Sequence, residues 1–153
     1  MKILLAAIFL TIVGTSLPAH AAYQAKVPHP EGGTQTRLAG RFSPARYSFR
    51  FHVTGYTLSE LKFTAPVGMQ LSRSIDIMDQ NGQKVAATIA LQGQVATVTF
   101  AQPVALDSKL SIDLNDVRTR DNSRIRELET SGKLGSIKED IPLQTVRLSP
   151  GYR

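Results

Sequence analysis

The sequence has 153 residues, no cysteine and a formal net charge of +6 at pH 7. Without cysteine, the chain cannot build a disulfide framework, a thiolate metal site or a cysteine nucleophile. Its length is that of one domain with a single hydrophobic core.

The N-terminal residues have the composition of a cleavable signal peptide. Lys2 precedes an eleven-residue, almost wholly apolar run, Ile3–Val13, and the small-x-small sequence Ala19-His20-Ala21 follows. A membrane-spanning helix needs roughly 20 apolar residues, about twice this run. We therefore predict a signal peptide over residues 1–21, with cleavage between Ala21 and Ala22. The mature chain is predicted to be exported, without a transmembrane segment, to the periplasm, the thylakoid lumen or the cell exterior.

The mature chain is predicted to begin with an irregular basic arm, residues 22–45. This segment is rich in Pro, Gly, Gln and Arg and has the period of neither a strand nor a helix. From Arg46 the pattern changes to alternation, with apolar residues at every second position from Tyr47 to Val53. Such alternation predicts a half-buried strand. It opens a domain predicted to span residues 46–148, and residues 149–153 form a short tail.

Further alternating segments follow along the chain, separated by turn residues. Asn81-Gly82 and Gln92-Gly93 suit the positive backbone angles of tight turns, and Asn81-Gly82 predicts a hairpin. Residues 118–133 are polar, and one interpretation of this segment is a helix of one or two turns. Residues 136–140 are typical of a loop. Alternation predicts the remaining strands over residues 61–65, 75–77, 85–91, 95–100, 110–114 and 143–148. About seven short strands with no amphipathic helix between them predict an all-β, immunoglobulin-like antiparallel two-sheet sandwich.

These strands also carry a family resemblance. The stretches concerned are Arg46–Phe51, Leu61–Pro66, Ile75–Ile77, Val98–Val104 with its Phe-x-x-Pro-Val element, Ser108–Leu114 and Val117-Arg118. Together they resemble a family of exported cyanobacterial proteins classed as a domain of unknown function. The resemblance covers about residues 46–118, and the chain departs from the family pattern at Thr119–Asn122. It implies a β-sandwich fold and an exported location, and it assigns no catalytic residue.

Nucleophilic catalysis would depend on the two histidines of the mature chain, His29 and His52. His29 lies between two prolines in the predicted arm, where nothing is expected to fix its ring. His52 is expected to face solvent from the polar side of the first strand. We therefore predict no catalytic residue and no cofactor. A small hydrolase is kept as an alternative, and it would need a deep pocket that contains His52 or a pair of acids.

Copper binding is a second alternative, because histidine and methionine suit that ion. The candidate ligands are His29, His52, Met69 and Met78. None of them is paired at a ligand-like spacing, and Met69 equally fits a core position at the start of a strand. The sequence therefore predicts no metal site, but it allows a periplasmic metal-binding module.

Basic residues are concentrated in the flanks of the chain. Residues 22–50 hold five basic residues against one acid, and residues 117–153 hold eight against five, whereas residues 51–116 hold four against six. Outside the cytoplasm, such a surface favours anionic lipid, an acidic polysaccharide or an acidic protein over nucleic acid.

Four arginines could form one patch if the arm packs beside the first strand. They are Arg37, Arg41, Arg46 and Arg50, and the guanidinium group grips carboxylate or phosphate in a fork. The function predicted from the sequence is therefore that of an exported, non-catalytic domain that binds an envelope protein or an anionic surface polymer.

Overall fold

The computed structural model describes residues 27–37, 44–120 and 125–149, so the predicted signal peptide and Arg41 lie outside the described residues. This part of the chain forms eleven strands and no helix that could span a membrane. The strands are β1 (His29–Arg37), β2 (Ala45–His52), β3 (Leu58–Thr64), β4 (Met69–Gln70), β5 (Ile75–Met78), β6 (Ala87–Gln92), β7 (Val95–Val104), β8 (Lys109–Thr119), β9 (Arg126–Leu134), β10 (Ile141–Pro142) and β11 (Val146–Leu148).

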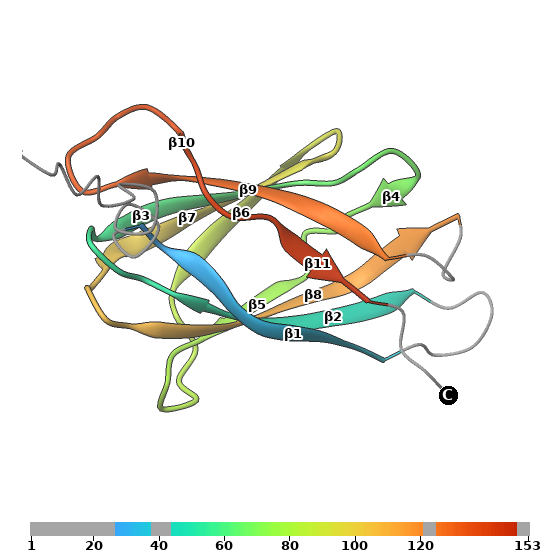
Figure 1. Cartoon of the computed structure of the whole chain (residues 1–153), viewed down its shortest axis with the longest axis horizontal. Helices are drawn as coiled ribbons and strands as arrows, with labels where there is room; N and C mark the ends of the chain where they lie inside the picture. The colour runs from blue at the N-terminus through green and yellow to red at the C-terminus, as the bar shows by residue number, and fades with distance from the viewer. Residues whose placement is uncertain (1–26, 38–43, 121–124, 150–153) are drawn as a thin grey trace, which may run out of the picture.

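Antiparallel pairing joins these strands into two sheets. The five-stranded sheet has the order β1-β2-β8-β4, and β5 also pairs with β8. The six-stranded sheet has the order β10-β9-β3-β7-β6, and β11 also pairs with β9. Figure 1 shows β1, β2, β5 and β8 in one layer and β3, β6, β7 and β9 in the other. The predicted all-β two-sheet sandwich is therefore confirmed.

One hydrophobic core fills the space between the sheets. Every second residue of β2 is buried and the residues between them face outward, as its alternation predicted. Phe49 of β2 meets Phe63 of β3 edge to face, with ring centroids 5.8 Å apart, so side chains of the two sheets interdigitate. Burying one large apolar side chain of this kind contributes about 1.5–3 kcal/mol. The outward positions of β2 carry polar residues, Arg46, Ser48, Arg50 and His52.

The prediction of an irregular arm is wrong for residues 29–37, which form strand β1. This strand pairs antiparallel with β2 and begins with His29 opposite His52. Among the described strands, β1 pairs within its sheet with β2 alone, and an edge strand of this kind tolerates a proline such as Pro30. The register shifts between Glu31 and Gln35, where the sequence reads Gly-Gly-Thr. This irregularity breaks the period of two and hid the strand in the sequence.

The helical interpretation of residues 118–133 is also wrong, because β8 extends to Thr119 and β9 occupies Arg126–Leu134. The inward positions of β9 are Leu128, Thr130, Gly132 and Leu134. Thr130 donates its hydroxyl hydrogen to the carbonyl oxygen of Gln144, which satisfies the one polar group in this row. With a threonine and a glycine at inward positions, the sequence alternation is too weak to identify a strand.

The turn at Asn81-Gly82 forms, with φ of 76° at Gly82. Asp79 Oδ1 accepts hydrogen bonds from the backbone N–H groups of Asn81 at 2.8 Å and Gln83 at 2.9 Å. The predicted hairpin is short: Met78 and Lys84 form an antiparallel bridge, and the N–H of Val85 donates to the carbonyl of Ile77 at 2.9 Å. Beyond these residues β5 pairs with β8 and β6 pairs with β7. The chain crosses from one sheet to the other after this turn.

Candidate functional site

Both histidines of the described chain lie side by side on the outer face of the five-stranded sheet. His29 of β1 is the register partner of His52 of β2. Glu31 is two residues after His29, and residues two apart on a strand project to the same face. The pairing of β1 with β2 therefore gathers two imidazoles and one carboxylate, which we call the histidine–glutamate cluster.

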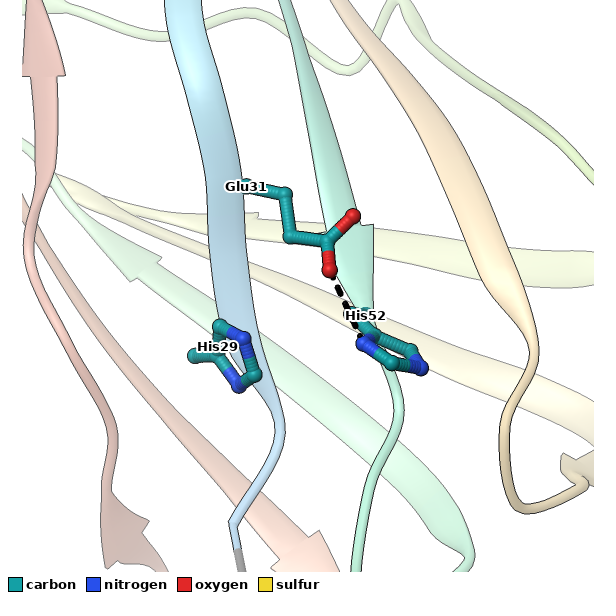
Figure 2. A group of neighbouring side chains, drawn as sticks. All are labelled: His29, Glu31 and His52. Carbon is teal, nitrogen blue, oxygen red and sulfur yellow. Dashed lines mark ion pairs between the residues drawn. The ribbon is translucent and has the colours of Figure 1, made fainter. Parts of the chain in front are cut away.

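Figure 2 shows the arrangement of this cluster, in which the carboxylate of Glu31 points toward the ring of His52. The distance from Glu31 Oε1 to His52 Nδ1 is 2.9 Å. The two imidazole rings meet edge to face with centroids 5.6 Å apart. One ligand atom from each of the three residues lies within 4.8 Å of the other two. All three side chains are only partly exposed.

The two rings differ in the partners of their remaining nitrogens. His29 Nδ1 lies 3.1 Å from the carbonyl oxygen of Val27, which can only accept, so this nitrogen carries the proton. The same carbonyl accepts from Thr54 Oγ1 at 2.8 Å. His52 Nε2 lies 4.0 Å from Asp107 Oδ1. At His29 the remaining nitrogen, Nε2, is therefore available to a ligand. At His52 the separation of 4.0 Å is too long for a hydrogen bond, so this contact does not hold Nε2.

One cation borders the cluster. Lys109 Nζ at the start of β8 lies 3.7 Å from Glu31 Oε2. Glu31 is thus shared between His52 on one oxygen and Lys109 on the other. With the Glu31 side chain 32% exposed, water screens both interactions. The cluster can act as a set of ion pairs when His52 is protonated, or as an N₂O donor set when both rings are neutral.

The structure corrects the expectations for the two histidines. The ring of His29 is held by Val27 rather than unconstrained, and the side chain of His52 is only 20% exposed. The two methionines lie elsewhere. Met69 of β4 is fully buried in the core, as a core filler would be. Met78 of β5 is separated from β2 by β8.

The predicted arginine patch is brought together only in part. Arg37 and Arg46 are register partners across β1 and β2, and Arg50 lies opposite Glu31. Arg46 pairs with the carboxylate of Asp113 on β8, at 2.5 Å between Nη2 and Oδ2. The described part of this patch therefore has mixed charge, because acids lie beside Arg46 and Arg50.

A pocket of about 400 Å³ lies at the end of β8 where Arg118 and Arg120 stand. Its walls also include Gln70 of β4, Gln94 of the β6–β7 turn and residues 67–69. Neither His52 nor a carboxylate lines it, so it is not the deep pocket that the hydrolase alternative requires. Sequence reasoning missed this pocket, although two arginines spaced two apart at a strand end were a usable signal.

Comparison with known proteins places this chain by its fold. No family model and no curated protein matches the sequence. The structure of the RrgA Jo.In complex is similar at 10% identity and a TM-score of 0.51, over 74% of this chain and 75% of that one. BslA, a bacterial hydrophobin, is similar at 18% identity and a TM-score of 0.49, over 81% of this chain and 98% of that one.

A further similar structure is the collagen-binding domain from a Staphylococcus aureus adhesin. It is 11% identical with a TM-score of 0.45, over 76% of this chain and 95% of that one. At 10% identity, the likeness to the RrgA Jo.In structure shows a common fold and not a common ligand.

Proposed function

We propose that this protein is an exported, non-catalytic β-sandwich that binds a divalent transition metal ion through His29, Glu31 and His52. One observation carries the proposal. The two histidines of the described chain are 23 positions apart in sequence, yet they are register partners with a carboxylate beside them. Two imidazoles and a carboxylate form the donor set found in several zinc and non-haem iron proteins.

The surroundings of the His29 ring support this proposal. A histidine that binds a metal usually donates its other N–H to a backbone carbonyl or a carboxylate, which fixes the tautomer and the ring orientation. Here His29 donates its Nδ1–H to the carbonyl of Val27, which leaves the Nε2 lone pair of the neutral ring for the ion. His52 Nε2 lies 4.0 Å from Asp107 Oδ1, which is beyond hydrogen-bond distance.

The donor set also indicates which ion binds. Nitrogen and oxygen donors bind Cu²⁺ most tightly among the divalent first-row ions, with Zn²⁺ below it. Cu⁺ prefers thioether sulfur, and neither Met69 nor Met78 joins the cluster. We therefore assign the site to Cu²⁺ or Zn²⁺, with water in the position that three protein ligands leave open.

The test is titration of the purified, metal-free protein with Cu²⁺ and Zn²⁺ by calorimetry, with thermal unfolding as a second readout. We expect one ion per chain, a raised Tm, and at least a tenfold loss of affinity in each of His29→Gln, Glu31→Gln and His52→Gln. Glu139→Gln is the matched control, because Glu139 is exposed in the loop before β10. Its affinity should equal that of the unaltered protein.

Copper-loaded protein gives an independent measurement if a histidine variant fails to fold. Electron paramagnetic resonance of the unaltered protein should show hyperfine coupling to two imidazole nitrogens. A spectrum without nitrogen coupling, or affinity unchanged in the folded Glu31→Gln and His52→Gln variants, overturns the proposal.

The binding of an anionic partner by Arg37, Arg41, Arg46 and Arg50 is a second candidate function. The register of Arg37 with Arg46 favours it, since two strands bring arginines together. Asp113 neutralises Arg46, however, and Glu31 lies opposite Arg50. The mixed charge of this face supports an anion site less well than the histidine–glutamate cluster supports a metal site.

A further inference from the structure

The pocket at the far end of β8 is separate from the histidine–glutamate cluster. Lys109 beside the cluster begins β8, and Arg118 and Thr119 beside the pocket end it. The nine residue-to-residue steps of strand from Lys109 to Arg118 span about 30 Å. The two ends of this strand therefore present different chemistry, and the pocket is available for a function that does not involve the metal ion.

Positive charge dominates this pocket. Arg118 and Arg120 line it and are both exposed. In the part of the chain that the structure describes, neither guanidinium has a carboxylate partner, and no acid lines the walls. A third arginine stands behind the pocket, because Arg126 Nη1 donates to the carbonyl oxygen of Val67 at 3.4 Å. Within the described residues, Arg118 and Arg120 thus place positive charge on a concave surface that no acid lines.

Uncharged hydrogen-bonding groups lie next to the arginines. Gln70 of β4 is the register partner of Arg118, and Gln94 lines the pocket from the β6–β7 turn. Both glutamines are exposed, and an amide side chain both donates and accepts hydrogen bonds. Val67 at the rim has 87% of its surface exposed, which offers an apolar contact. The pocket therefore combines anion, hydroxyl and C–H recognition.

We propose that this pocket binds one acidic sugar residue of an anionic polysaccharide. Arginine forks match a carboxylate with two parallel hydrogen bonds. Amide side chains suit the hydroxyl groups of a sugar ring, and Val67 suits its apolar face. The volume of about 400 Å³ lies within the range of about 300–1,000 Å³ typical of small-molecule sites. An anionic lipid surface is a poorer fit, because it is flat, whereas the arginines line a concave pocket.

The probe for this proposal is trigalacturonate, with maltotriose as a neutral trimer of the same length. Binding to the purified protein is followed at low salt by calorimetry and by amide chemical shifts. We expect trigalacturonate to bind, to shift the amides of residues 67–70, 94 and 118–120, and to weaken as salt is raised. Maltotriose should bind at least tenfold more weakly.

Charge-matched variants locate the site. Arg118→Gln and Arg120→Gln should each reduce affinity for trigalacturonate at least fivefold, and Arg50→Gln should change it less than twofold. Dispersed amide spectra of each variant show that it is folded. His52→Gln should leave the affinity unaltered, which separates this proposal from the metal site.

Three results would overturn the assignment. The first is equal binding of maltotriose. The second is an equal loss of affinity in Arg50→Gln, which would move the anion site to the outer face of the sheet. The third is tighter binding of triglutamate than of trigalacturonate at residues 118–120, which would make the partner an acidic protein.

Discussion

The guanidinium of Arg46 on β2 pairs with the carboxylate of Asp113 on β8, next to the hydroxyl of Ser48 that binds the same carboxylate. Asp113 is one of two buried polar or charged residues among the described positions, and its side chain is only 11% exposed. A buried carboxylate is costly unless it is paired and hydrogen-bonded. Arg46 thus stabilises the fold by pairing with Asp113. We therefore expect Arg46 and Arg50, which both face outward from β2, to contribute differently to stability.

We predict that Arg46→Met destabilises the protein by about 1–2 kcal/mol. The loss is below the 3–5 kcal/mol of a fully buried pair, because half of the Arg46 side chain is exposed to water. The control is Arg50→Met, which removes the same charge from an exposed position of β2 and should change stability by less than about 0.5 kcal/mol. Urea unfolding of both variants checks this, and equal midpoints would contradict a structural role for Arg46.

A second prediction concerns Gly132 on β9, where a Cβ atom would lie 2.7 Å from the backbone oxygen of Glu60. A backbone atom cannot move aside as a flexible side chain can, so Gly132→Ala should push β9 away from β3. We expect a loss of about 1–3 kcal/mol, the usual range for overpacking. Ser131→Ala is the neighbouring control and should be nearly neutral. If the urea midpoint of Gly132→Ala is unaltered, β9 and β3 can accommodate the added Cβ atom without loss of stability, and the prediction is wrong.

Most of the strands were predictable, for a physical reason that also explains the exceptions. Four strands bury apolar side chains on one face, namely β2, β3, β7 and β8. Their sequences therefore alternate between apolar and polar residues. β9 uses Thr130 and Gly132 at inward positions, because the backbone of Glu60 approaches too closely for a side chain at 132. Sequence alternation cannot report a close backbone approach from another strand.

The residues of the candidate site were predictable one by one, but their arrangement was not. His29 and His52 were both named as possible ligands, yet they become neighbours only through the register of β1 on β2. That register depends on hydrogen bonds between strands and on the irregularity after Glu31. Once β1 is known to be a strand, the same-face spacing of His29 and Glu31 points directly to the cluster.

Tyr47 gives a prediction about alkaline stability. Burial raises the pKa of Tyr47 above its ordinary value of 10.0, and the charge of Arg126 only partly offsets this rise. The phenol of the unfolded chain therefore loses its proton first as the pH rises. The contribution of Tyr47 to the free energy of unfolding is therefore fully present below pH 10. Above pH 10 this contribution falls by up to about 1.4 kcal/mol per pH unit, until the phenol of the folded protein also ionises.

Urea unfolding of the unaltered protein and of Tyr47→Phe between pH 9 and 11.5 checks this difference. The variant lacks the phenol and should lose less stability over the range than the unaltered protein. Tyr56→Phe is the matched control, since Tyr56 is 47% exposed. Parallel pH profiles for the unaltered protein and Tyr47→Phe would contradict the raised pKa.

Lys109 gives the last prediction, on the strength of metal binding. Its ammonium group lies 3.7 Å from Glu31 Oε2, so it competes with a cation for that carboxylate and repels a divalent ion. Two unit charges about 4 Å apart interact by about 1 kcal/mol even in water, and a divalent ion doubles the repulsion. Lys109→Met should therefore tighten Cu²⁺ and Zn²⁺ binding at least about fivefold in calorimetric titration. Lys84→Met removes the same charge from the Lys84–Asp76 pair, which lies outside the cluster, and should leave the affinity within about twofold. Weaker metal binding in Lys109→Met would mean that Lys109 holds Glu31 in place for the ion instead of competing with it.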